Sequence, residues 1–232
     1  MNKFINILLV STFLLSSITI AYAQEEREVR NLSPYHSVKV SGSYKVQLVV
    51  GDPGSITLEG SKLSVISTSI KNNVLHIRSK PNLKWTNWRG STTITVPIED
   101  IKSLSLSGSG KITGDRTLDV DKLKISVSGS GRVNLNVSAD SIESSVSGSG
   151  GITLSGDTDN VSFSLAGSGY LKASDLKADS AIGNISGSGS IEVYASDSFN
   201  GHVSGSGRIT CYGNPEKQNQ KISGSGRISF AN

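Results

Sequence analysis

The chain contains little cysteine, little histidine and few long apolar runs, and each shortage excludes a class of protein. Its single cysteine, Cys211, excludes an intrachain disulfide framework. The three histidines lie far apart and lack the spacing of metal ligands; they are His36, His76 and His202. After the first residues, no apolar run approaches the roughly 18 residues that a membrane helix needs. The net charge of +4 is too mild to indicate nucleic acid. We therefore expect no metal, no other cofactor and no nucleic-acid partner.

Glycine and serine are abundant instead, and they recur as a triplet. Gly-Ser-Gly occurs seven times, with steps of 21, 19, 19, 20, 18 and 19 residues between first glycines. The copies begin at Gly108, Gly129, Gly148, Gly167, Gly187, Gly205 and Gly224. Similarity at a short fixed period is typical of stacked repeats. A flexible linker has a similar composition, but it does not place aliphatic residues at fixed positions.

Three positions around each triplet are apolar or small in every copy. The position two residues before the triplet holds Leu106, Val127, Val146, Leu165, Ile185, Val203 and Ile222. The second position after it holds Ile112, Val133, Ile152, Leu171, Ile191, Ile209 and Ile228. The fourth holds Gly114, Leu135, Leu154, Ala173, Val193, Cys211 and Phe230. Polar residues alternate with these columns, which indicates half-buried strands.

The period and the columns together predict an all-β fold, a parallel β-solenoid with coils of about 19 residues. The glycines would lie at corners that need positive φ or close approach between coils. Cys211 falls in an apolar column, so we expect a buried thiol rather than a nucleophile or a metal ligand.

The start of the chain has the organisation of a secretory signal peptide, residues 1–23. Lys3 precedes an apolar run, and the small-x-small sequence Ala21-Tyr22-Ala23 precedes Gln24. We therefore expect an exported protein, in the periplasm, at the cell surface or secreted.

The remainder divides into a leader and one domain. Residues 24–32 are highly charged and are expected to form a flexible leader. Residues 33–232 are expected to form a single β-solenoid domain, irregular at 33–100 and regular at 101–232. Within the irregular section, Val40 to Val46 is a degenerate copy of the repeat, with Tyr44 in place of the second glycine.

Three stretches resemble a bacterial family described as "putative auto-transporter adhesin, head GIN domain". They are GDPGSITLEG at 51–60, ITVPIEDI at 94–101 and SLSLSGSG at 103–110, and the resemblance extends over roughly 36–230. It implies a right-handed parallel β-helix similar to pectin-lyase-like folds, located at the cell envelope. It also implies an adhesion role, and it brings no catalytic residues to this chain.

The position directly after each triplet is the best candidate for ligand binding. Its cationic and aromatic members are Lys111, Arg132, Tyr170, Arg208 and Arg227. Strand alternation turns these side chains outward in one stripe, which could bind an extended anionic ligand such as a glycan through guanidinium groups. Alternatively, the cations only keep an exposed β-surface soluble. Trp85 and Trp88 add a second candidate, either a sugar-stacking platform or a plug of the solenoid.

Catalysis has weaker support. Carboxylate pairs could come from Asp119 and Asp121 or from Asp157 and Asp159, but nothing fixes the separation that glycosidic cleavage requires. The sequence therefore favours a non-enzymatic envelope protein for adhesion or glycan binding. A polysaccharide-active enzyme and a structural envelope spacer are the alternatives. The last coil has no obvious cap, so end-to-end self-association is also expected.

Overall fold

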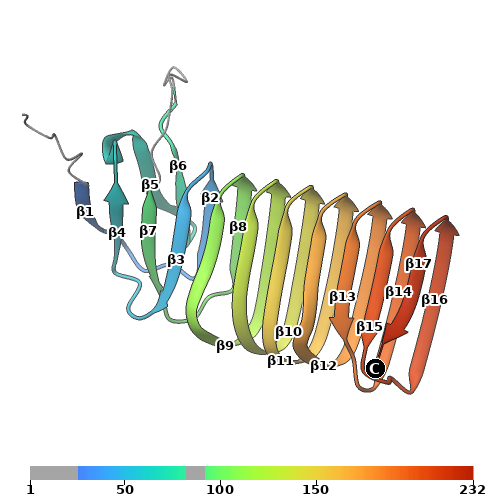
Figure 1. Ribbon diagram of the computed structural model, residues 1–232. Coiled ribbons are helices and arrows are strands. Elements are labelled where there is room, and N and C mark those ends of the chain that lie inside the picture. The colour runs from blue at the N-terminus through green and yellow to red at the C-terminus, as the bar shows by residue number, and fades with distance from the viewer. Residues whose placement is uncertain (1–25, 82–91, 232) are drawn as a thin grey trace, which may run out of the picture.

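The structure is a computed structural model and describes residues 26–81 and 92–231, 76% of them in β-strands (Figure 1). The strands wind into a solenoid of about 7 turns with coils of about 19 residues. This confirms the predicted solenoid with its irregular N-terminal section. No α-helix occurs in the described ranges, and the one helical turn is the 3-10 turn η1 (Leu63–Val65).

The regular coils stack in register, and each pairs in parallel with the coil before and after it. Val133, for example, lies between Ile112 and Ile152. The long strands bend around most of a coil, whereas later coils are divided in two. The strands are β8 (Ser103–Gly108), β9 (Lys111–Gly129), β10 (Arg132–Gly148), β11 (Gly151–Gly167), β12 (Tyr170–Gly187), β13 (Ser190–Tyr194), β14 (Ser198–Gly205), β15 (Arg208–Tyr212), β16 (Lys217–Gly224) and β17 (Arg227–Ala231).

Each coil contributes to two walls of the solenoid. The residues that follow a triplet form the first wall, which runs through the starts of β9–β12 and then through β13, β15 and β17. The residues that precede the next triplet form the second wall, which runs through the ends of β9–β12 and then through β14 and β16. The Gly-Ser-Gly corner joins the second wall of one coil to the first wall of the next.

Strands β2 (Ser37–Ser41) and β3 (Lys45–Val50) form one coil, and its neighbours in the stack are not the strands that precede and follow it in sequence. It lies between the β8–β9 coil on one side and β6 (Val74–Ser79) with β7 (Thr93–Ile98) on the other. Between β3 and β8 the chain forms β4 (Ser55–Gly60), β5 (Ile66–Lys71), β6 and β7. It then crosses to the other side of the β2–β3 coil to begin β8. The degenerate copy of the repeat is a full rung of the stack, because the N–H groups of Ser109 and Gly110 both donate to the oxygen of Gly42.

The segment Glu26–Asn31 corrects one expectation. Residues 24–32 were expected as a flexible leader, yet Glu26–Asn31 forms strand β1, which pairs antiparallel with β4 along its whole length. Arg30 donates to the carbonyl oxygen of Ile66 at 2.9 Å and to the carboxylate of Glu28 at 2.9 and 3.0 Å. The hydrogen bond from Arg30 lowers the pKa of Glu28. The high charge of this segment suggested a flexible leader, but one of its charged side chains, Arg30, binds the segment to the irregular section.

The apolar columns predicted from the repeat form one continuous core. Their side chains are buried in the complete coils, and Phe163 and Phe199 are among the largest fully buried ones. In the last coil, Ile222 is 46% exposed. Gln218 occupies the inward column that holds Phe199 one coil earlier, and its amide donates to Pro215. A polar side chain at the end of the core is typical of terminal repeats.

The two glycines of each triplet are required for different reasons. The first has positive φ in every copy, for example +105° at Gly129 and +112° at Gly148. The second does not, but it approaches the preceding coil closely, since a Cβ added at Gly150 would lie 2.5 Å from the oxygen of Gly131. Backbone hydrogen bonds such as Gly150 N–H to Gly129 O, at 2.8 Å, close the corner. The first glycine is therefore required both for its positive φ and for its close approach to the preceding coil, whereas the second is required for the close approach alone.

Ser144 provides the first test of the core. It lies in an inward column between Ile125 and Phe163, is 1% exposed, and its hydroxyl has no hydrogen-bond partner among the described residues. Replacing Ser144 with alanine should raise the free energy of unfolding by about 1 kcal/mol, because it removes a buried unpaired hydroxyl. Urea denaturation measures this, with Ser145→Ala as the control, since Ser145 does donate to Ser126 at 3.1 Å. A loss of stability for Ser144→Ala would contradict the assignment.

Candidate functional site

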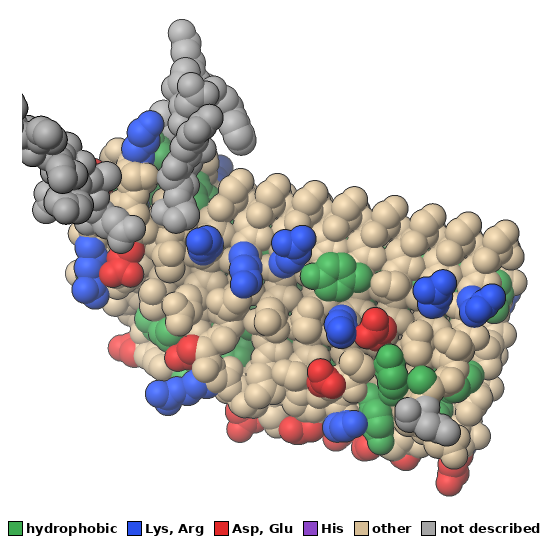
Figure 2. All heavy atoms as spheres, in the orientation of Figure 1, with side chains coloured by type: hydrophobic (Ala, Val, Ile, Leu, Met, Phe, Trp, Pro, Cys, Tyr) green, Lys and Arg blue, Asp and Glu red, His purple; other side chains and the backbone are tan. Residues whose placement is uncertain are grey.

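The predicted stripe is a continuous column on the first wall, called here the outward column. Strand register places one member on each coil, next to the member of the following coil. In order, the members are Lys45, Lys111, Arg132, Gly151, Tyr170, Ser190, Arg208 and Arg227. Figure 2 shows basic side chains along this wall, interrupted by an aromatic ring. Adjacent rungs of a sheet are about 4.8 Å apart, so the column presents regularly spaced donors.

Sequence reasoning missed Lys45, although a signal for it was present. Lys45 directly follows the degenerate copy of the triplet, at the position that Lys111 occupies in the next coil of the stack. The rule that identified the other members would have included it had the copy been treated as a full repeat.

Tyr170 is held in a defined place in the outward column. A Cβ added to Gly151, the preceding member, would collide with the Tyr170 ring, so the ring lies over this glycine. Gly151 is buried beneath it even though its position faces outward. A partly exposed aromatic ring seated on the wall offers a flat surface on which an apolar face of a ligand could stack.

The cations of the outward column have no acidic partners within the described ranges. The ion pairs there lie elsewhere, and none includes Lys45, Lys111, Arg132, Arg208 or Arg227. The adjacent column on the same wall is mainly polar: Gln47, Thr113, Asn134, Thr153, Lys172, Glu192, Thr210 and Ser229. The wall thus combines unpaired positive charge with hydroxyl and amide groups.

A hollow of about 310 Å³ lies at the N-terminal end of the outward column, where β7, β3 and β9 run side by side. Its polar lining consists of Lys45, Gln47, Thr93, Lys111 and Thr113. The lining contains two cations and no acid.

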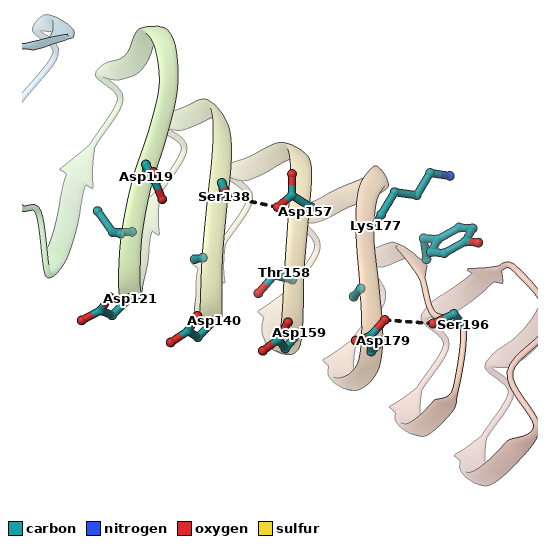
Figure 3. A pocket seen from close by; sticks show the side chains of 14 residues that line it. Asp119, Asp121, Ser138, Asp140, Asp157, Thr158, Asp159, Lys177, Asp179 and Ser196 are labelled. Carbon is teal, nitrogen blue, oxygen red and sulfur yellow. Dashed lines mark hydrogen bonds between the residues drawn. The ribbon is translucent and has the colours of Figure 1, made fainter.

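The aspartates weighed as catalytic candidates come together in a second, larger hollow of about 750 Å³ (Figure 3). Strand register stacks them as an open ladder across four coils. The carboxylates that line it, all exposed, are Asp119, Asp121, Asp140, Asp157, Asp159 and Asp179. Two are held by neighbouring hydroxyls, since Ser138 donates to Asp157 at 3.0 Å and Ser196 donates to Asp179 at 3.1 Å. Glycosidic cleavage requires two carboxyl groups at a set separation that flank the scissile bond, whereas the ladder places exposed acids in a row on successive coils.

The remaining candidates do not join a site. His36, His76 and His202 stay apart, and no group of three or more histidine, cysteine or acidic side chains in the described chain is arranged to hold a metal ion. Burial and nearby cations, Lys39 first among them, lower the pKa of His76. Trp85 and Trp88 lie outside the described residues, so their role as a platform or plug stays a prediction.

Cys211 is a buried free thiol, as predicted. Burial raises the pKa of the thiol to about 11. Because the thiolate is the reactive form, a thiol-reactive dye at mildly alkaline pH should label the native protein only as fast as it unfolds. Labelling should become rapid and complete in denaturant. Rapid labelling without denaturant would show that the column opens locally at this coil.

The fold and the outward column together define a class of protein, a stacked β-solenoid with a basic, polar wall. The chain belongs to the family described as "Putative auto-transporter adhesin, head GIN domain", whose model matches residues 34–215. The resemblance drawn from the sequence is therefore confirmed. The family is described as adhesins rather than enzymes, which indicates a surface or exported protein. The described residues contain no helix long and apolar enough to cross a membrane.

Solved structures with the same fold come from Bacteroides and Parabacteroides species. A putative adhesin from Bacteroides fragilis is 20% identical with a TM-score of 0.81, and the match covers 90% of this chain and 98% of that one. A putative lipid binding protein from Parabacteroides distasonis is 26% identical with a TM-score of 0.74, over 90% and 98% of the two chains. A putative adhesin from Parabacteroides merdae is 19% identical with a TM-score of 0.72, over 90% and 97%. No protein with a curated function matches the chain.

Proposed function

We propose that this protein is a non-enzymatic adhesion module that binds an extended anionic glycan along the outward column. The observation that carries the proposal is the row of exposed cations without acidic partners, with Tyr170 seated among them. Guanidinium groups bind carboxylate and sulfate in a fork geometry. Sugar rings present apolar faces that stack on aromatic rings, and their hydroxyls match the polar column beside the cations. The periodic wall therefore fits a periodic ligand better than a compact one.

The proposal includes export. Residues 1–23 would direct the chain across the inner membrane, and the protein would act in the periplasm or at the cell surface. The adhesin-like family supports a position where extracellular polysaccharides are accessible.

The test is binding of the protein to an array of acidic and neutral polysaccharides. One variant carries Lys111→Ser, Arg132→Ser, Arg208→Ser and Arg227→Ser. The control variant, with the same change in net charge, carries Lys39→Ser, Lys71→Ser, Lys80→Ser and Lys122→Ser, all at exposed positions outside the column. We expect salt-sensitive binding of acidic polysaccharides, weakened about tenfold or more in the column variant and largely retained in the control.

Other outcomes would replace the proposal. An equal loss in both variants would mean non-specific attraction of a basic protein. Binding retained by the column variant would mean that another part of the chain binds the polysaccharide, with Trp85 and Trp88 as the next candidates. Release of new reducing ends would favour the polysaccharide-active enzyme. The absence of any binding would favour a structural spacer of the envelope.

We also propose that a second copy docks end to end on the last coil. Within the described residues, strands β16 and β17 each pair on one side only, and Ile222 in β16 is 46% exposed. Lys217 and Lys221 lie on the same strand and would face their counterparts, so association should strengthen as salt screens them. Sedimentation at high protein concentration tests this, with Ile222→Lys expected to abolish it and Val29→Lys, at the opposite end, as the control. A monomer at high salt and high concentration would refute it.

A further inference from the structure

The hollow lined by Lys45 and Lys111 differs from the rest of the outward column. Of the outward column, only Lys45 and Lys111 border this hollow, a space of about 310 Å³ beside β7, β3 and β9. This volume is at the lower end of the range of small-molecule sites, roughly 300 Å³ and upward. It is therefore large enough for one anionic group and part of the sugar that carries it.

The charges in this hollow are unfavourable when it is empty. Lys45 and Lys111 are direct neighbours on adjacent strands, and like charges in that arrangement repel each other. Neither forms an ion pair with a carboxylate in the described parts of the chain. An anion held between the two ammonium groups would remove the repulsion.

The other polar groups complete a set of donors. Thr93 on β7 lies beside Lys45 on β3. Two residues further along β3, Gln47 lies beside Thr113 on β9. Two hydroxyls, one amide and two ammonium groups therefore border one small space. Each can donate a hydrogen bond, and charge-assisted bonds from lysine to an oxyanion are the strongest of them.

We propose that this hollow is the anchoring subsite for a sulfate or carboxylate group carried by a sugar. The inference rests on the proposed function and deepens it, because Lys111 belongs both to the hollow and to the column that runs on toward Arg227. The anionic group is held between Lys45 and Lys111, with Thr93, Gln47 and Thr113 donating to its remaining oxygens. The rest of the glycan continues along the wall past Arg132 and Tyr170.

The test uses small probes that cannot span the column. Inorganic sulfate and D-glucuronate are titrated into the isotope-labelled protein, and amide chemical shifts are followed by NMR. We expect saturable shifts centred on the strands that border the hollow. Lys45→Gln should weaken the binding of both probes about tenfold, as expected for one charge-assisted hydrogen bond. Lys39→Gln and Lys122→Gln, both at exposed positions outside the outward column, should leave it within about twofold.

The failure of this inference is distinguishable from the failure of the proposed function. Shifts spread over all exposed lysines, or unchanged affinity in Lys45→Gln, would overturn the subsite even if polysaccharide binding depends on the column. Saturable probe binding lost in Lys45→Gln, with no polysaccharide bound, would support the subsite and refute the extended site. Vesicles with anionic lipid headgroups form a third arm, and tighter, Lys45-dependent binding to them than to sulfated glycans would refute a sugar as the carrier.

Discussion

Replacing Gly148 with alanine is expected to destabilise the protein by about 3 kcal/mol or more. Gly148 has a φ of +112°, a conformation that side chains rarely adopt, and an added Cβ would lie 2.7 Å from the oxygen of Gly129 in the preceding coil. That oxygen accepts hydrogen bonds from Ser149 and Gly150, at 3.0 and 2.8 Å. The substitution therefore combines backbone strain with disruption of the bonds that close the corner.

Gly183→Ala is the matched control, because it makes the same chemical change in the next-but-one coil of the same stack. Gly183 has no positive φ, and its nearest neighbour, Ile209, would be 3.4 Å from an added Cβ. Alanine there should be neutral or stabilising by about 0.4–1 kcal/mol, since it reduces the entropy of the unfolded chain. Chemical denaturation of both variants measures the difference. Equal stabilities would mean that the corners are not constrained as the structure indicates.

Replacing Phe163 with alanine is expected to cost about 3–5 kcal/mol. Phe163 is fully buried, and its neighbours in the same inward column are Ser144 on one coil and Gly183 on the next. Both are small, so neither can extend into the space that the ring leaves, and the cavity would persist. In a repeat protein whose coils contact only their neighbours, the defect should weaken the stack at its middle.

Ile182→Ala serves as the control for Phe163→Ala. Ile182 is 42% exposed on the same wall and leaves no buried cavity when truncated, so the expected change is within about 0.5 kcal/mol. Denaturation followed by circular dichroism compares the two variants. A small effect of Phe163→Ala would show that the neighbouring coils close over the vacancy.

The repeat made the core and the outward column predictable from sequence. Alternation fixes which side of a strand each residue faces, and a constant period fixes its neighbours on adjacent coils, so the prediction that Arg132 lies beside Lys111 follows from counting alone. Cys211 was placed in the core by the same reasoning. These successes depend on local geometry that repeats without change.

The sequence was less informative where the repeat is interrupted. The position of the β2–β3 coil depends on pairings between distant segments, such as Ser37 with Ser103, that no local pattern reveals. Strand β1 depends on tertiary hydrogen bonds of Arg30. The aspartate ladder could have been predicted by the same counting, because Asp121, Asp140 and Asp159 are 19 residues apart, but the acids were considered only as pairs within one coil.

The β2–β3 coil also determines how the molecule can be built during synthesis. It is synthesised early, directly after β1, yet in the finished stack it has a neighbour on both sides, so winding proceeds from it in two directions. The side that β6 and β7 cover closes through contacts between segments nearer in sequence, whereas the other side forms only when β8 pairs with β2. Once β8 is in place, each further coil needs only the one before it, and such short-range propagation is fast. We therefore expect the slow step of folding to lie in the first eight strands, and the length of the wall to be free to change by whole coils without altering that step.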